Sequence, residues 1–239
     1  MSIDVQIWSD IACPWCYIGK RRFEKALDGF AHRDAVNVTW RSYQLDPSLP
    51  EHDHRAEAEY LSEVKGMPRA QVGEMLAHVK EQAAGEGLDY DFDSLVVANS
   101  RKAHRLLHAA KQADAADGGT RAGRLKEALL EGHFVEGKHI GDDDTLVALG
   151  TAAGLDEATA RDALASEELD ARVEQDILEG HQIGVRGVPF FVFENKYGVS
   201  GAQPPELFAQ ALETVWSEKQ PSLITLDGGS GEACGPDGC

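Results

Sequence analysis

Residues 3–16 read Ile-Asp-Val-Gln-Ile-Trp-Ser-Asp-Ile-Ala-Cys-Pro-Trp-Cys, and this stretch decides the fold. Its first six residues alternate apolar and polar side chains, which is the pattern of a half-buried β-strand. Pro14 suits the first turn of a helix, where its missing N–H costs no hydrogen bond. The sequence therefore places Cys13 and Cys16 at a strand-to-helix junction.

The flanking segments complete a strand–helix–strand unit. Apolar residues recur at the i, i+3, i+4, i+7 spacing of a helix packed on a sheet: Phe23, Ala26, Leu27 and Phe30. Residues 36–40 alternate again and predict a second strand. Residues 49–184 instead predict helices, separated by glycine-containing breaks near residues 66–68, 85–87, 117–119 and 137.

The C-terminal third predicts a hairpin and one more helix. An apolar strand covers residues 188–193, a turn follows, and a second strand begins at Tyr197. Pro205 opens a helix with a broad apolar face that reaches Trp216. The fold class is therefore α/β, in the order βαβ, helical insertion, ββα.

This order predicts three parts of the chain. Residues 1–48 and 185–217 form one discontinuous domain, and residues 49–184 form a helical insertion within it. Residues 218–239 form a glycine-rich tail that carries Cys234 and Cys239 and is expected to be flexible.

Cys13 and Cys16 are the candidate catalytic residues. Two thiols in the first turn of a helix lie on one face, close enough to form a disulfide. The start of a helix favours an anion, so we expect a lowered pKa for Cys13, which would attack, while Cys16 would resolve the mixed disulfide. A zinc half-site or two incidental thiols are the alternatives, but a strand-to-helix junction in a βαβ unit favours redox chemistry. No metal site is predicted.

The chain resembles the DsbA-like thioredoxin-fold oxidoreductases, and most closely their FrnE-like cytosolic branch. The resemblance covers about residues 3–216 and rests on the element order and on these motifs: Cys13-Pro14-Trp15-Cys16-Tyr17, Tyr43-Gln44-Leu45-Asp46-Pro47, Asn99-Ser100, Ala103-His104-Arg105, Gly187-Val188-Pro189 and the pair Cys234 and Cys239. It implies a thioredoxin fold with a large helical insertion, and protein disulfide oxidoreductase or isomerase activity.

The resemblance also implies roles around the cysteines. Pro189 would be cis and face the cysteine pair, and the Val188 backbone would offer hydrogen bonds to substrate. Pro14 and Trp15 would shape the site. Related kappa-class glutathione transferases and 2-hydroxychromene-2-carboxylate isomerases share the insertion but lack a Cys-x-x-Cys pair and usually have serine at its first position. Glutathione-dependent chemistry on a small molecule is therefore the alternative function.

The amino-acid composition limits the classes of partner that the protein is expected to bind. The formal net charge is −18 and no long basic run occurs, which argues against nucleic acid. No segment is long and apolar enough for a membrane span, and the first residues lack a signal-peptide pattern, so we expect a cytoplasmic protein. The expected partners are disulfide-containing proteins or small molecules, with a low-molecular-weight thiol or a reductase as electron partner. No cofactor is expected besides the redox-active disulfide.

The remaining histidines, a basic cluster and the tail cysteines are interpreted separately from the site. His52 and His54 are interpreted as part of a solvated loop, and His104 and His108 as packing or surface residues. A basic cluster on the first helix is interpreted as a solvated face: Lys20, Arg21, Arg22 and Lys25. The tail pair Cys234 and Cys239 is a second redox dithiol, a metal ligand pair or inert in catalysis.

Overall fold

The computed structural model describes residues 1–219. Its sheet has the strand order β2-β1-β3-β4. The strands are β1 (Ile3–Ser9), β2 (Val36–Ser42), β3 (Phe190–Phe193) and β4 (Tyr197–Ser200). β1 pairs in parallel with β2 and antiparallel with β3, which pairs antiparallel with β4. The fold is thus the expected thioredoxin fold with a helical insertion.

Nine α-helices complete the described part of the chain. They are α1 (Pro14–Asp28), α2 (Glu57–Lys65), α3 (Arg69–Ala84), α4 (Arg101–Asp117), α5 (Arg121–Phe134), α6 (Asp143–Ala152), α7 (Glu157–Ala165), α8 (Glu167–Gln182) and α9 (Pro205–Lys219), with a short 3₁₀ turn at Arg33–Ala35. None of these helices is long and apolar enough to cross a membrane.

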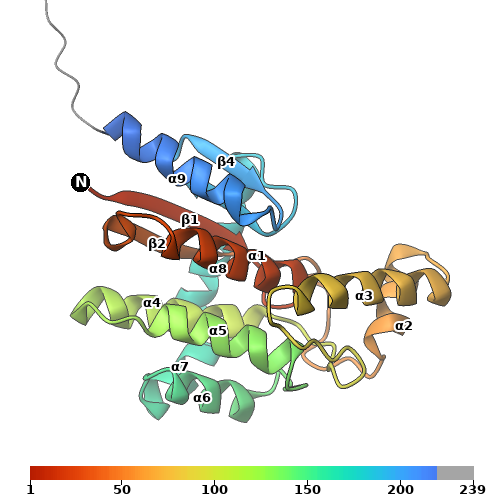
Figure 1. Cartoon of the computed structure of the whole chain (residues 1–239). Helices are drawn as coiled ribbons and strands as arrows, with labels where there is room; N and C mark the ends of the chain where they lie inside the picture. The colour runs from red at the N-terminus through yellow and green to blue at the C-terminus, as the bar shows by residue number, and fades with distance from the viewer. Residues whose placement is uncertain (220–239) are drawn as a thin grey trace, which may run out of the picture.

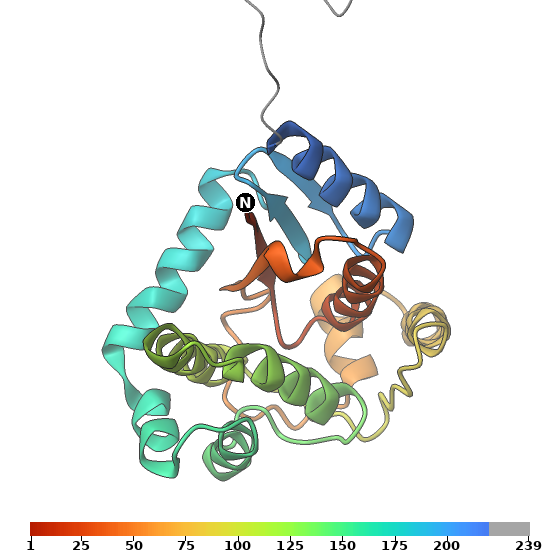
Figure 2. The same ribbon diagram turned by 60° about the vertical axis from the view of Figure 1, so that its left-hand side comes forward.

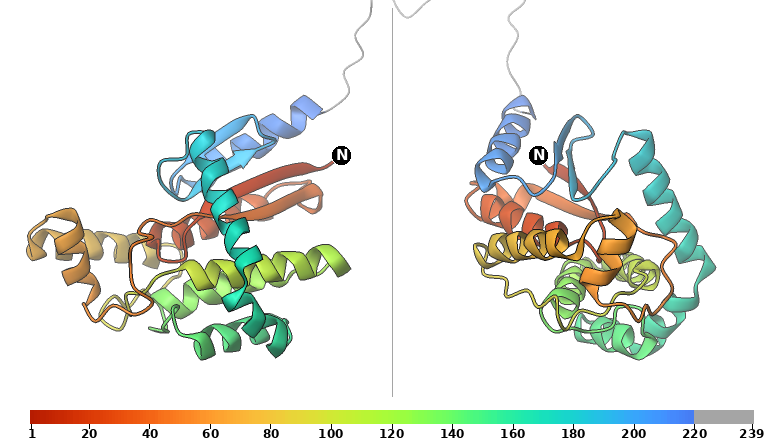
Figure 3. Two further views of the ribbon diagram at one scale, coloured as in Figure 1. Left: turned by 180° about the vertical axis from the view of Figure 1, so that it is seen from behind. Right: turned by 90° about the vertical axis from the view of Figure 1, so that its right-hand side faces the viewer.

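The helices surround the sheet unevenly (Figure 1). α1 and α9 pack side by side on one face of the sheet, while α8 runs past β2 on the other side (Figure 2). α4 to α7 form a block beyond β2, and α2 and α3 extend away from it (Figures 1 and 3). We call residues 57–84 the α2–α3 arm.

The hydrophobic core forms from the apolar residues that alternate along β1 and from the apolar stripe of α1. Ile3, Val5 and Ile7 are fully buried. Phe23 of α1 packs against aromatic rings of β3 and α9, with ring centroids 5.5 Å from Phe191 and 5.7 Å from Phe208. These contacts fix α1, and with it the cysteine pair at its start, against the end of the sheet.

The helical insertion follows the predicted breaks. α2 ends at Gly66 and α4 at Gly118, whose positive φ values of 62° and 76° are the left-handed conformation that glycine adopts without strain. Buried side chains of α4 and α5, such as Leu106 and Leu125, belong to the same apolar cluster as Ile7 of β1. The insertion and the sheet therefore share one core.

Candidate active site

The start of α1 holds both cysteines. β1 ends at Ser9, and Cys13 is the N-cap of α1 with an extended backbone, so Pro14 occupies the first helical position. The Cys16 amide donates to the Cys13 carbonyl at 3.0 Å. Both side chains are free thiols and are buried, with exposed fractions of 3% for Cys13 and 1% for Cys16.

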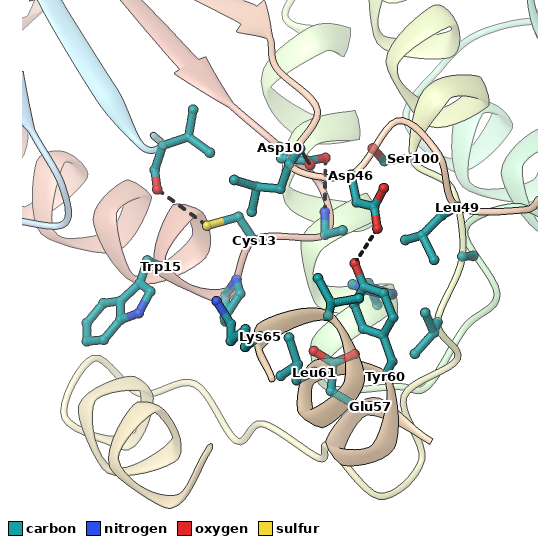
Figure 4. A pocket seen from close by; sticks show the side chains of 18 of the residues that line it. Asp10, Cys13, Trp15, Asp46, Leu49, Glu57, Tyr60, Leu61, Lys65 and Ser100 are labelled. Carbon is teal, nitrogen blue, oxygen red and sulfur yellow. Dashed lines mark hydrogen bonds between the residues drawn. The ribbon is translucent and has the colours of Figure 1, made fainter. Parts of the chain in front are cut away.

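The segment before β3 lies directly against Cys13. The Cys13 thiol donates to the Val188 carbonyl over 3.5 Å (Figure 4). The Val188–Pro189 peptide bond is cis, as the resemblance implies, and Pro189 is buried. A Cβ atom at Gly19 of α1 would lie 2.8 Å from Cγ of Pro189. The absent side chain at Gly19 therefore lets this segment approach the cysteines.

Gly19→Ala is expected to lower stability by about 1–3 kcal/mol, because the added methyl group overpacks the contact with Pro189. The rate at which the Gly19→Ala protein carries out thiol–disulfide exchange should also fall, by about tenfold or more, because Val188 is displaced from Cys13. Gly73→Ala in α3 is the matched control: no atom lies within 4 Å of its Cβ position, and alanine favours a helix by up to about 1 kcal/mol. Urea unfolding and exchange kinetics measure both effects. A Gly19→Ala protein as stable and active as Gly73→Ala would contradict the packing argument.

A cavity of about 720 Å³ opens beside Cys13 (Figure 4). Its walls come from the start of α1, the segment after β2, the α2–α3 arm, the segment before α4 and the segment before β3. The lining residues include Asp10, Ala12, Cys13, Pro14, Trp15, Leu45, Asp46, Leu49, Glu57, Tyr60, Leu61, Val64, Lys65, Met75, Leu76, Val79, Val97, Ala98, Ser100, His133, Gly187 and Val188. Cys13 lines this cavity, whereas Cys16 lies behind it.

Trp15 lies next to Cys13 at the start of α1 (Figure 4), and its ring centroid lies 6.2 Å from that of His78 in α3. The Tyr90 hydroxyl, from the insertion, donates to the Pro14 carbonyl at 2.7 Å. Both contacts tie the cysteine motif to the insertion. The insertion is therefore part of the site.

A buried carboxylate lies just before the cysteine motif. Asp10 is 1% exposed and accepts hydrogen bonds from the amides of Leu45 at 2.7 Å and Ala12 at 3.3 Å. Its other neighbour is Nε2 of His104, 3.3 Å away. Burial alone would raise the pKa of Asp10, but these partners lower it, whereas burial lowers the pKa of His104. The pair is therefore a carboxylate beside a neutral imidazole.

A buried lysine lies beneath the motif. Lys126 of α5 is fully buried, and its Nζ atom has no hydrogen-bond partner among residues 1–219. It lies 5.4 Å from the ring centroid of Trp40 in β2. Burial lowers the pKa of Lys126 to about 8, although the charges of Cys16 and Asp10 act against this shift. A positive charge is therefore held in the interior on the side of Cys16.

These charges shift the pKa values of the two thiols in opposite directions, and the shift of Cys13 is the reverse of the one that the sequence predicts. The hydrogen bond with Cys16, burial and the charge of Asp10 raise the pKa of Cys13 well above its usual range. Burial would also raise the pKa of Cys16, but the hydrogen bond with Cys13 and the charge of Lys126 lower it. The predicted lowering of the Cys13 pKa is wrong for the dithiol form. For Cys13, the effect of the helix start is outweighed by the hydrogen bond with Cys16, by burial and by the charge of Asp10.

Lys126→Met should raise the pKa of Cys16, because it removes the positive charge that stabilises the Cys16 thiolate. The pH dependence of thiolate absorbance measures it in a Cys13→Ser background. Lys80→Met removes an exposed lysine and is the control. An identical Cys16 titration in both variants would contradict the assigned role of Lys126.

A model of the DSBA-like thioredoxin domain matches residues 4–213. The chain belongs to the DsbA-like thioredoxin family. A structure described as a probable DsbA oxidoreductase from Streptomyces coelicolor is 44% identical, with a TM-score of 0.84, over 99% of this chain and 98% of that chain. These findings agree with the family that the sequence resembles.

Two further structures share the fold. The cytosolic disulfide reductase DsbM from Pseudomonas aeruginosa, in a structure with GSH, is 20% identical, with a TM-score of 0.62, over 90% of this chain and 99% of that chain. A 2-hydroxychromene-2-carboxylate isomerase is 12% identical, with a TM-score of 0.63, over 90% of this chain and 97% of that chain. At these identities the likeness concerns the fold alone.

The basic cluster of this DsbA-like chain is not a solvated face. Lys20 is only 4% exposed and pairs with Glu127 of α5 at 2.5 Å, and Arg21 pairs with the same carboxylate. Arg22 pairs with Glu86, just after α3, at 2.6 Å. The interpretation as a solvated face is therefore wrong for these three cations, which join α1 to the insertion, whereas Lys25 is exposed as expected.

Two of the four histidines considered in the sequence are buried and two are exposed. His104 and His108 are buried, and each contacts a carboxylate, Asp10 or Asp176. His52 and His54 are exposed as expected, but the His52 ring lies between two other imidazoles, with Nδ1 2.6 Å from His139 Nε2 and Nε2 2.9 Å from His54 Nδ1. Within residues 1–219, no group of three or more His, Cys, Asp or Glu side chains is suited to a metal ion. Cys234 and Cys239 lie outside the described residues.

Asp10, His104 and Lys126 are the residues near the cysteines that sequence reasoning did not place in the site. His104 carried a signal, because it belongs to a motif of the resemblance. Lys126 carried none, since a lysine in a helical segment is ordinarily exposed.

Proposed function

We propose that this protein is a thiol–disulfide oxidoreductase that uses Cys13 and Cys16 as a redox dithiol. The observation that carries the proposal is the position of Cys13. Its thiol lines a cavity large enough for a ligand, while Cys16 lies behind it within reach of a hydrogen bond. One sulfur can meet a substrate and the other can reach only the first sulfur.

The proposed reaction begins when the Cys13 proton passes to the Cys16 thiolate. Cys13 then attacks one sulfur of a substrate disulfide and forms a mixed disulfide, and the other half leaves as a thiolate that takes up the proton from Cys16. Cys16 attacks the Cys13 sulfur, closes the Cys13–Cys16 disulfide and releases the second half, which takes a proton from water. Two electrons pass from the dithiol to the substrate.

The dithiol itself carries the electrons, so the cycle needs no bound cofactor. A thiol of low molecular weight or a reductase would restore the reduced pair. In a reducing cytoplasm, which we propose as the location, the enzyme would act mainly as a reductase or isomerase. The substrate would be a disulfide in a protein or a small molecule, and the Val188 carbonyl and Pro189 would shape its binding site.

Insulin reduction with dithiothreitol tests the proposal. The full chain should accelerate the reaction well beyond dithiothreitol alone, and a chain ending at residue 219 tests whether Cys234 and Cys239 take part. A wild-type rate equal to that of dithiothreitol alone, together with turnover of a glutathione-dependent substrate, would instead favour the isomerase or transferase alternative.

A further inference from the structure

The cavity beside Cys13 has a largely apolar wall. Leucine, valine and methionine side chains from the α2–α3 arm line one side of it: Leu61, Val64, Met75, Leu76 and Val79. Leu45 and Val64 are 53% and 57% exposed, although large apolar side chains are usually buried. Both lie in the cavity wall, so apolar surface is left open beside the reactive sulfur.

The charged groups of the same cavity are mostly acidic. Asp10, Asp46 and Glu57 line it, and Lys65 is the only lysine or arginine among the lining residues that the structure describes. Asp46 accepts a hydrogen bond from the Tyr60 hydroxyl at 2.9 Å (Figure 4). Burial raises the pKa of Glu57 to about 7, against the weaker opposing charge of Lys65. The wall therefore offers little to bind a carboxylate.

We propose that this cavity selects disulfides of low molecular weight that carry an uncharged apolar group, and that it disfavours anionic disulfides such as glutathione disulfide. The inference rests on the thiol–disulfide exchange proposed above. It concerns which sulfur compound reaches Cys13, not whether Cys13 reacts.

The size of the cavity favours a small molecule as the occupant. Pockets for small organic ligands typically have volumes of about 300–1,000 Å³, and this cavity has about 720 Å³. The α2–α3 arm forms one side of it, next to Cys13 and Trp15 (Figure 4). An apolar group on the attacked sulfur would be buried against Leu61 and Met75, and this burial would hold the sulfur next to Cys13.

Two electrostatic effects act on an anionic disulfide, one from the whole protein and one from the cavity wall. A net charge of −18 repels every anion, but salt screens this long-range effect over about 10 Å at 0.1 M ionic strength. Glu57 acts at short range within a partly desolvated wall, where screening is weaker. Discrimination that persists at high salt and depends on Glu57 would therefore come from the cavity.

Two chromogenic aromatic disulfides provide the test: 4,4′-dithiodipyridine, which is neutral at pH 7, and 5,5′-dithiobis(2-nitrobenzoate), which is a dianion. The pre-reduced full-length protein is mixed with each probe, and each rate is divided by the rate of the same probe with dithiothreitol. We expect the normalised rate to be at least about tenfold higher for the neutral probe, a difference of about 1.4 kcal/mol. Equal normalised rates would overturn the inference.

Matched variants assign the preference to the cavity. Leu61→Asp should remove most of the advantage of the neutral probe, whereas Leu178→Asp, at a 54% exposed position on α8, should leave it unchanged. At pH 8, where Glu57 with its pKa of about 7 is mostly ionised, Glu57→Gln should raise the rate of the anionic probe. Glu74→Gln, which removes a carboxylate from the exposed side of α3, should not. Leu61→Gln is a second, uncharged variant in case Leu61→Asp does not fold.

The outcomes separate this inference from the proposed function. Leu61→Asp and Leu61→Gln proteins that keep the wild-type preference would overturn the specificity while leaving the exchange reaction intact. If neither probe reacts faster than with dithiothreitol and insulin is not reduced, the proposed function itself fails. Efficient insulin reduction that Leu61→Asp leaves unchanged, with no preference between the probes, would identify a protein substrate instead.

Discussion

Cys13→Ser is expected to abolish insulin reduction, with a loss on the order of 10³-fold or more, because no other described thiol lines the cavity. The rate should fall to that of dithiothreitol alone. Residual catalysis above this background would mean that Cys16 or a tail cysteine reaches the substrate directly. The matched control is Ser48→Ala, which changes an exposed residue at the rim of the same cavity and leaves both thiols in place.

Cys16→Ser should have a different signature. Cys13 would still attack, but no second thiol would release the product, so the mixed disulfide between Cys13 and the substrate half should accumulate. Mass spectrometry after a non-reducing quench measures this adduct. Equal adduct levels in Cys16→Ser and wild-type protein would contradict the role of Cys16 as the resolving thiol.

The strand-to-helix junction was predictable because its signals are local. Alternation over six residues places β1, and the proline after Cys13 places the start of α1 at the position that the structure shows. The strand at residues 188–193 was predicted two residues too long, because the chain around Val188 bends past Cys13 before β3 begins at Phe190. Local patterns thus gave the scaffold of the site.

The electrostatics of the site was not predictable, because it depends on pairs that are distant in sequence. Lys126 is brought beneath Cys16 by the packing of α5 on α1, and His104 reaches Asp10 from α4. A single sequence shows that a predicted helix contains a lysine. It does not show which face of the helix packs against the rest of the protein, or which residues the lysine meets there. The direction of the Cys16 pKa shift, which the charge of Lys126 helps to lower, therefore required the structure.

The same reason applies to Lys20. Four cations within one helix indicate a solvated face when the helix is considered alone, since buried charges without partners are costly. The insertion supplies the partner, because Glu127 lies opposite Lys20. The insertion thus covers a face of α1 that would be exposed to solvent in a thioredoxin fold without it.

A buried carboxylate of α8 binds the last residue of β2, at the same end of the sheet as the cysteine motif, and should contribute strongly to stability. Asp176 of α8 is 2% exposed, and its side chain joins three elements. It accepts from the Ser42 amide at 2.9 Å and from Arg41 at 2.7 Å, and it lies 3.1 Å from His108 Nε2. It also pairs with Lys111 at 3.3 Å. Removing it would leave buried donors and a cation without their partner.

Asp176→Ala should therefore lower the free energy of unfolding by about 3–5 kcal/mol, the usual cost of breaking a buried pair by removing one partner. Urea unfolding measures it, with Asp162→Ala at an exposed position of α7 as the control. A loss no larger than that of the control would mean that the cluster contributes nothing to stability.

The pH dependence gives an independent check on the same carboxylate. Burial would raise the pKa of Asp176, but the His108 hydrogen bond, the Lys111 charge and the Ser42 amide lower it below its usual range. A carboxyl group with a lowered folded-state pKa stabilises the protein fully above its unfolded pKa of about 3.9, and this stability is lost as the pH falls toward the folded value. Wild-type protein should thus lose stability below about pH 4 more steeply than Asp176→Ala. Parallel acid profiles for the two proteins would show that Asp176 has the same pKa in the folded and unfolded states.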